Sequence, residues 1–439
     1  MVASVNGNGS HVYPGGNIVV TSTGDINIGG GADIHAVGGE RVTGLFRAAD
    51  DITMGAEGDA AKITLEATSE TDGYSGRDAN AEAQLEMIAA GGSLDIAEGE
   101  IEVTAVAVAG NTVHDNGNSS PVAYRVGGNN NARAVATAFM SGEHTDINAD
   151  ITVAADAQAS SMGPVPNGVD NVASASCFQC ESHGPDAAEA IAALDVFAVG
   201  EPGNLLMEGD INVTANAWTE DSRSSMATAN GILAATGDLD VEGDINVDAV
   251  ATSDAGSSVV TPLATSAIDC LEANCNGYSS NAADANAALL MLGGAPRGLL
   301  EPLYFLSVNV PERLGTLSAI LTLTNARDLL DIFEGIEGFG LDFGPVGHGE
   351  VNYKGDINVT SVAEFNAIGD IGLRREGLAQ ATSAAYIAGG GGTYIDTDPI
   401  VVDSQAYANY DDFDYDNDSV EPTVVLNTGD SYVDSEARS

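Results

Sequence analysis

One short sequence, Gly-Asp-Ile-Asn followed by an aliphatic residue, recurs along the chain and constrains the fold more than any other feature. After most copies comes a polar loop of variable length, and then a segment in which alanine occupies every second position, as in Ala132-Arg-Ala134-Val-Ala136-Thr-Ala138. The isoleucines of the clear and looser copies are Ile26, Ile63, Ile101, Ile151, Ile211, Ile245, Ile357 and Ile400. Such units bury their apolar faces by stacking on one another. We therefore expect an array of stacked repeats.

The alanine segments are predicted to be strands. Alanine is a strong helix former, but small apolar residues at every second position have the period of a strand and not the 3.6-residue period of a helix. A glycine turn and a further short apolar segment often follow, as in Gly237-Asp-Leu239-Asp-Val241. Three short strands per repeat predict an all-β fold, a parallel β-solenoid (β-helix) of about eight irregular coils. An antiparallel β-sandwich of hairpins is the alternative.

The spacing of the copies divides the chain. It is shortest between Ile211 and Ile245 and by far the longest between Ile245 and Ile357. The long gap holds a segment rich in Leu and Phe, in which Asn325 caps an expected short helix that Gly335 ends. We expect a lid over an edge or flank of the solenoid there, with a subunit contact as the alternative. The predicted parts are an N-terminal cap and first coil (1–60), a repeat solenoid (61–295), the inserted lid (296–349), the last coils (350–406), and an acidic joint with C-terminal strands (407–439).

The charge of the chain restricts its partners and its habitat. Lys and Arg total 14 against 65 Asp and Glu, so the net charge is −51 over 439 residues. Nucleic acid and anionic membranes require cationic contacts that such a chain lacks. An apolar content of 44% is too high for a disordered acidic tail. We expect a folded protein of an extracellular or cell-surface, marine or high-salt setting, where salt screens the repulsion. A merely acidic cytosolic protein is the alternative.

Targeting features and cysteines give further expectations. No apolar run is long enough to span a membrane, and the segment from Met1 to Val20 lacks the pattern of a signal peptide. Close pairs of cysteines in an extracellular chain favour two small disulfide loops. A zinc site that joins the pairs is the alternative. The cysteines are Cys177 and Cys180 in one pair and Cys270 and Cys275 in the other.

Two groups of aspartates are candidate calcium ligands. The aspartates of the clear motif copies are expected at one corner of successive coils, where like charges repel unless a cation or a turn amide lies between them. An amide that each carboxylate accepts is the alternative to calcium. A second cluster near the C-terminus departs from the EF-hand pattern and is either a loose calcium site or a solvated linker. The candidates are Asp25, Asp210, Asp244 and Asp356 in the repeat, and Asp412, Asp414, Asp416 and Asp418 in the cluster.

The two ends of the array are candidate assembly sites. The ends of a solenoid are open sheet edges, which must be capped or paired. Strands at Ile18, Val19 and Val20 and at Val424, Val425 and Leu426 are expected either to cap the chain's own rod or to add to the sheet of a second copy. A heterologous contact that does not close produces a filament. No catalytic constellation is visible, because the six histidines are scattered and the carboxylates belong to the repeat itself.

The coil pattern resembles that of bacterial surface β-solenoids of the filamentous-haemagglutinin and adhesin type. Gly92-Ser-Leu94-Asp-Ile96 followed by Ile101-Glu-Val103 carries the resemblance, which covers roughly residues 15 to 295 and 350 to 405. The coils here are longer, and the corner aspartates are unusual. The resemblance implies an exported, non-enzymatic surface protein. We expect a self-assembling filament or layer subunit stabilised by divalent cations. The alternatives are a monomeric calcium-dependent adhesin that binds glycans and a polysaccharide lyase or hydrolase.

Overall fold

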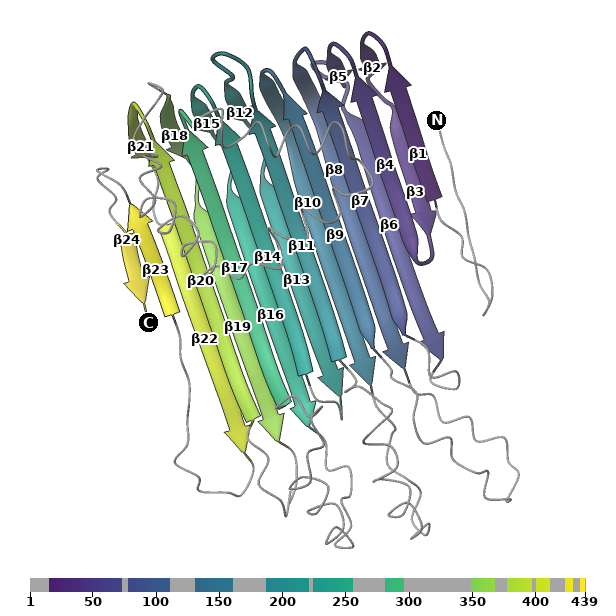
Figure 1. Cartoon of the computed structure of the whole chain (residues 1–439), viewed down its shortest axis with the longest axis vertical. Coiled ribbons are helices and arrows are strands. Elements are labelled where there is room, and N and C mark those ends of the chain that lie inside the picture. The colour runs from purple at the N-terminus through teal and green to yellow at the C-terminus, as the bar shows by residue number, and fades with distance from the viewer. Residues whose placement is uncertain are drawn as a thin grey trace, which may run out of the picture.

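The chain is all-β wherever its structure is described. A computed structural model describes residues 16–72, 78–110, 131–160, 187–220, 224–255, 281–295, 349–367, 377–396, 400–410, 423–428 and 435–438. These residues contain no helix, and their strands form two sheets, of nine and fifteen strands (Figure 1). Every strand ladder within these ranges is parallel, as in the pairing of β1 with β4 and of β19 with β22. The predicted parallel all-β class is confirmed, and the antiparallel sandwich is wrong.

The nine-stranded sheet is built, in chain order, from the six alanine segments and three further strands, two before them and one after. The predicted assignment of these segments to strands is therefore confirmed. Its strands are β1 (Gly16–Ser22), β4 (Arg41–Ala48), β7 (Ala79–Ala89), β9 (Ala132–Gly142), β11 (Ala187–Ala198), β14 (Ser224–Ala235), β17 (Asn281–Gly293), β20 (Gly377–Gly389) and β23 (Thr423–Thr428).

The fifteen-stranded sheet contains long strands and short strands of three to five residues. The long strands are β3 (Asp33–Gly38), β6 (Ala61–Asp72), β8 (Leu94–Gly110), β10 (Thr145–Ser160), β13 (Ile211–Glu220), β16 (Ile245–Ala255), β19 (Ile357–Ala367), β22 (Ile400–Tyr410) and the four-residue end strand β24 (Ser435–Arg438). The short strands are β2 (Ile26–Ile28), β5 (Ile52–Met54), β12 (Leu205–Met207), β15 (Leu239–Val241), β18 (Glu350–Lys354) and β21 (Gly392–Asp396). In β8 and β10 the short element runs directly into the long one.

The register of the long strands follows the motif isoleucines, with one correction. Ile63, Ile101, Ile151, Ile211, Ile245, Ile357 and Ile400 pair in succession across the fifteen-stranded sheet. Ile26 does not join them, because it lies in the short strand β2 and pairs with Ile52. Ile34 of β3 is the residue that pairs with Ile63. The copy at residues 25–28 therefore lies one strand earlier in its repeat than predicted.

The main core lies between the two sheets and changes thickness along the strands. Near the short strands it contains Ile, Val, Leu and Met side chains, such as Ile245, Val247 and Met291. Further along, both sheets present alanine, as at Ala229 and Ala251. There the sheets meet closely, since the Ser383 hydroxyl in β20 donates to Ser361 Oγ in β19 at 2.8 Å. The core is therefore a wedge, which alanine makes thin at one side.

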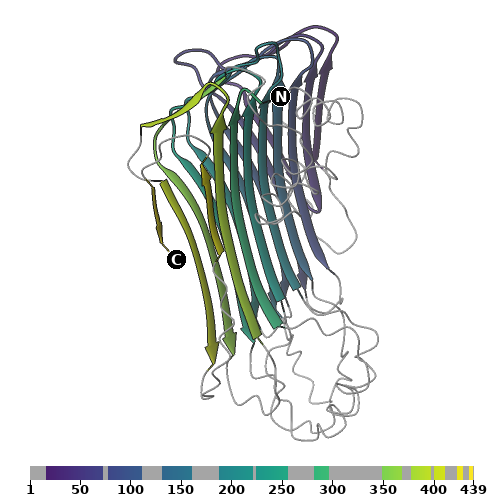
Figure 2. The same ribbon diagram turned by 60° about the vertical axis from the view of Figure 1, so that its left-hand side comes forward.

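The arrangement places the first and last strands of the chain at opposite ends of the stack. Strands far apart in sequence lie far apart along the sheets, and the colours run in order from the N-terminal to the C-terminal end (Figures 1 and 2). The predicted insertion at 296–349 lies outside the described residues except for Gly349, so its lid and helix stay predictions, as do the other part boundaries. Within the described ranges, no helix is long and apolar enough to cross a membrane.

Candidate assembly edges and corner ladders

Two corners connect the strands of each repeat. The first corner joins a strand of the nine-stranded sheet to a short strand, and the second corner joins the short strand to a long strand of the other sheet. Three of the four predicted repeat aspartates, Asp210, Asp244 and Asp356, lie at the second corner. Asp25 lies at the first corner, directly before β2. The expectation that all four share one corner is therefore corrected, because both corners place an Asp before an apolar strand.

At the second corner each aspartate binds the next repeat. The Asp150 carboxylate accepts the backbone N–H of Asp210 at 3.0 Å. The Asp210 carboxylate accepts that of Asp244, and the Asp244 carboxylate that of Asp356, both at 2.9 Å. The sheet's own ladder continues beside them, since Ile211 N–H donates to the Asp244 carbonyl at 2.8 Å. In each step of this second-corner ladder, one carboxylate oxygen therefore accepts a backbone N–H group. This is the arrangement that was expected if a turn amide, and not calcium, lies at the corner.

The glycine before Asp210, Asp244 and Asp356 lets the repeats approach. A Cβ atom on Gly209 would clash with the Ala149 carbonyl, and one on Gly243 would clash with the Gly209 carbonyl. Gly355 has a φ of +131°, a conformation that L side chains rarely adopt. The Gly-Asp pair of the motif thus has two roles: glycine permits the close stacking of backbones, and aspartate accepts the amide of the next repeat.

The first corner uses the same device with varied side chains. Asp25 accepts the Asp51 N–H at 3.3 Å, and Asp51 accepts the Ser93 N–H at 2.8 Å. Further along, Asn204 Oδ1 accepts the Asp238 N–H at 3.1 Å, and Asp238 accepts the Glu350 N–H at 2.9 Å. Sequence reasoning missed this ladder at the first corner. Its signal was the Asp or Asn directly before the short apolar segments.

Both lysines of the chain link acidic neighbours across repeats. Lys62 Nζ lies 2.9 Å from Glu100 and 3.5 Å from Glu102, and Lys354 Nζ lies 2.5 Å from Glu242. The hydrogen bond to Glu100 is the main cause that raises the pKa of Lys62 above its usual value. All of these side chains are substantially exposed, so each pair contributes little to stability.

The remaining predicted ligands stay predictions. The described residues contain no group of three or more His, Cys, Asp or Glu side chains arranged to hold a metal ion. Calcium at the repeat aspartates is likewise still a prediction. The acidic cluster at Asp412, Asp414, Asp416 and Asp418 lies outside the described residues, and so do Cys177, Cys180, Cys270 and Cys275.

The N-terminal end of the stack is an open strand edge. β1 ends the nine-stranded sheet and pairs only with β4 among the described strands. The Ser22 carbonyl accepts the Ala49 N–H and so points toward β4. Because successive residues of a strand point their backbone groups to opposite sides, the N–H groups of Val19 and Thr21 point toward the open side. The Val19 side chain is 62% exposed, whereas Ile18 is buried in the core.

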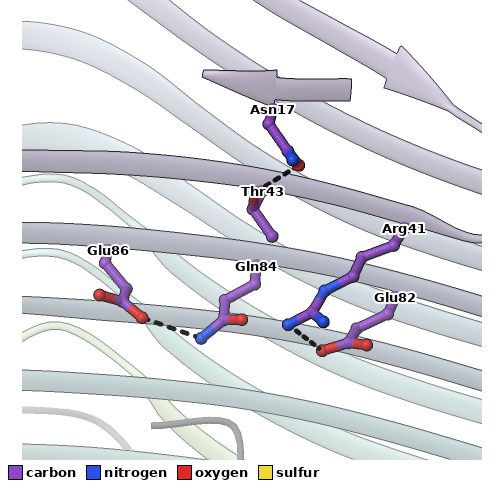
Figure 3. A network of polar contacts seen from close by, with 6 residues as sticks. All are labelled: Asn17, Arg41, Thr43, Glu82, Gln84 and Glu86. Atoms are coloured by element: carbon purple, nitrogen blue, oxygen red, sulfur yellow. Dashed lines mark hydrogen bonds and ion pairs between the residues drawn. The ribbon is translucent and has the colours of Figure 1, made fainter. Parts of the chain in front are cut away.

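Side-chain contacts hold β1 and its neighbours in register. Thr43 donates its hydroxyl proton to Asn17 Oδ1 at 2.6 Å, between β1 and β4 (Figure 3). One strand further, Arg41 of β4 lies 3.4 Å from Glu82 of β7 (Figure 3). These contacts lie on the outer face and leave the backbone edge of β1 unblocked.

The C-terminal end of the stack carries shorter strands. β23 pairs with Thr382–Ile387 of β20, and β24 pairs with Ile400–Asp403 of β22. The backbone of Val424, Val425 and Leu426 thus lies in β23, beside its own chain, as the self-capping expectation requires. Beyond Asp403, β22 has no further described partner on this side. Tyr394 of β21 and Tyr407 of β22 are 59% and 47% exposed.

Two acidic side chains on the outer face of the nine-stranded sheet are buried. Burial is the main cause that raises the pKa of Glu86 in β7 to about 7, although Arg47 at 3.4 Å acts in the opposite direction. Gln84 donates to Glu86 at 3.1 Å (Figure 3). Burial alone raises the pKa of Asp195 in β11 to about 7. Sequence reasoning missed both residues, since it treated acidic residues as solvated.

Any proposal about function rests on the geometry of the structure. No family model, curated protein or solved structure matches this chain.

Proposed function

We propose that the chain is a non-enzymatic β-solenoid subunit that assembles head to tail into an extracellular filament or surface layer. The observation that carries the proposal is the location of exposed apolar side chains. Within the described ranges, the large hydrophobic residues that are exposed are Val19, Tyr394 and Tyr407, and all three lie on strands at the ends of the stack. An end strand lacks a lateral neighbour on one side, and a strand from a second copy would supply it.

Parallel pairing makes the two ends complementary. In each sheet the strands run in one direction, so a second copy translated along the stack presents β1 and β3 in the orientation that the C-terminal edge requires. In this arrangement, β23 and β24 form a rung between β20 and β22 of their own chain and the first strands of the next. The contact is heterologous and does not close, so it propagates. We propose about eight coils per subunit, to which β23 and β24 add a partial rung.

The surface charge supports the proposed setting. A net charge of −51 opposes the approach of two copies, and salt or divalent cations reduce this repulsion. In each step of the second-corner ladder, a single carboxylate oxygen accepts the amide of the next repeat. We propose that calcium acts on the remaining acidic surface and at the interface between copies.

Electron microscopy of the purified chain tests the proposal, first with millimolar calcium and then with a chelator. We expect fibres or sheets with calcium, and shorter or fewer assemblies with the chelator. Isolated short rods in both conditions would contradict assembly. The glycan-binding and polysaccharide-degrading alternatives would then be the ones to assay.

A matched pair of variants tests the edge itself. Val19→Pro removes an N–H that points to the open side and leaves the hydrogen bonds to β4 intact. Val19→Thr replaces one methyl group of the side chain with a hydroxyl, which makes it more polar, and keeps that N–H. If backbone pairing drives assembly, the proline variant fails to polymerise and, added in small amounts, caps wild-type fibres and shortens them. The threonine variant forms fibres. Normal fibre formation by the proline variant would show that this edge is not the interface.

A further inference from the structure

A second apolar cluster lies on the outer face of the nine-stranded sheet. We call it the outer patch; its residues are Ile88, Phe139, Phe197, Val199, Ile232, Ala234, Leu290 and Ala295. In β11, Leu194 and Val196 point into the core between the sheets, so Phe197 points away from it. The rings of Phe139 and Phe197 are 5.6 Å apart between centroids. Phe197 is nevertheless only 2% exposed.

A side chain on the outer face of a sheet is not buried by its neighbours in that sheet alone. On the outer face of the other sheet, the corresponding side chains of β13, such as Asn212, Thr214 and Asn216, are half-buried or exposed. On the outer face of the nine-stranded sheet, even polar residues such as Thr228 and Asn286 are buried. Each described strand belongs to one of the two sheets, so none of them lies over the outer patch. A further layer of chain is required to cover it.

The ends of the segment 296–348 lie beside the patch. Ala295, the residue before the segment, belongs to the patch and donates its N–H to the Ala235 carbonyl at 2.8 Å. Gly349, the residue after it, accepts the Gly391 N–H at 2.7 Å, and the backbones of Gly294 and Gly349 are in close contact. The chain therefore leaves the sheet at the patch and returns to the same corner after the segment.

The composition of this segment suits an apolar surface. It contains eleven leucines and four of the chain's ten phenylalanines. Leu, Ile, Phe and Val together are about two in five of its residues, against one in five or fewer in each of the ranges 111–130, 161–186 and 256–280. Burial of apolar surface is the main driving force for such packing.

We propose that residues 296–348 pack across the outer patch, so that the nine-stranded sheet becomes the middle layer of three. This inference does not depend on filament formation. It nevertheless bears on assembly, because an uncovered patch of this kind is an association site in its own right. With the patch covered, association between copies is directed to the strand edges.

Limited trypsin digestion of the full chain tests the inference. The segment contains Arg297 next to its start, and Arg313 and Arg327 further along. Cleavage at Arg313 and Arg327 is measured by mass spectrometry against a synthetic peptide of residues 296–348 as the uncovered reference. We expect both sites to be cut far more slowly in the protein than in the peptide. Cleavage at equal rates would overturn the proposal.

Two variants show whether the patch itself is the source of this protection. Phe139→Ser weakens the patch without touching the core between the sheets, and we expect cleavage at Arg313 and Arg327 to rise by about tenfold or more, since cleavage follows the open population. Val362→Ser makes the same kind of change on the outer face of β19 and leaves the rate unchanged. Circular dichroism confirms that both variants retain their sheets. Protection that Phe139→Ser does not reduce, or that grows with protein concentration, would assign the cover to another segment or to a second copy and overturn the proposal.

Discussion

At the scale of single residues, the corner aspartates act as backbone acceptors. Each carboxylate of the second-corner ladder takes the place that a carbonyl oxygen has within a strand, and extends the hydrogen bonding between repeats around the turn. An amide oxygen can serve equally well, as Asn204 does at the first corner. The function of these residues is therefore separable from their charge.

Substitution at Asp244 tests this separation. Asp244→Ala leaves the Asp356 N–H to water and is expected to lower the free energy of unfolding by about 1 kcal/mol. Asp244→Asn keeps the acceptor and removes one negative charge, so its stability is expected to match or exceed that of the wild type. Thermal unfolding by circular dichroism, with calcium and with chelator, measures both. Equal loss in the two variants, seen only with calcium, would instead indicate a cation ligand.

Asp195 gives a pH dependence of stability. Its pKa of about 7 in the folded state lies above the value of about 4 in an unfolded chain, so the folded state holds its proton more tightly. This stabilisation is complete below pH 4 and is lost progressively as the pH rises from there through 7. Asp195→Asn should match the wild type near pH 4 and be more stable at pH 8, by on the order of 4 kcal/mol.

Denaturant unfolding at pH 4, 6 and 8 checks this expectation. Some slope should persist in Asp195→Asn, because burial also raises the pKa of Glu86 to about 7 and that residue is unchanged. Parallel pH profiles of the variant and the wild type would show that Asp195 ionises normally.

At the scale of the elements, much of the fold follows from the sequence pattern. Alanine alternation predicts the long strands of the nine-stranded sheet, and seven motif isoleucines give the register of the other sheet. The position of Ile26 was mispredicted, because Asp25-Ile-Asn-Ile and Asp238-Leu-Asp-Val have the same local pattern as the copies at the second corner. Local sequence does not distinguish two corners that are built by the same rule.

The burial of the outer face was also not predicted, for a related reason. Alternation identifies one buried face, and the other is assumed to be wet. The available signal is the loss of alternation in β11, where the outward-facing Ile191, Ala193 and Phe197 are as apolar as the neighbouring residues that face the core.

The corner glycines give the prediction at this scale. Gly243→Ala places a Cβ against the Gly209 carbonyl, so the two repeats must move apart, and we expect a loss of about 2 kcal/mol or more. Gly29→Ala is the control, because a Cβ there meets no atom within 4 Å. Urea unfolding of both variants measures the difference. A harmless Gly243→Ala would mean that the corner is looser than described.

At the scale of the whole molecule, the negative charges along the stack repel one another. Sodium chloride shortens the range of this repulsion from about 10 Å at 0.1 M to about 3 Å at 1 M. We therefore expect the melting temperature to rise steadily over this range, with sucrose as an uncharged control. A melting temperature that is flat or falls with salt would show that the repulsion does not limit stability.

Helical reconstruction of the fibres by cryo-electron microscopy tests the central claim, head-to-tail stacking, most directly. The nine-stranded sheet contributes nine rungs spaced about 4.8 Å apart, so we predict a rise of about 43 Å per subunit, with both sheets continuous across the junction. Fibres in which β1 of one copy does not lie against the C-terminal strands of the next, or particles that stay single at every salt and calcium concentration, would contradict it.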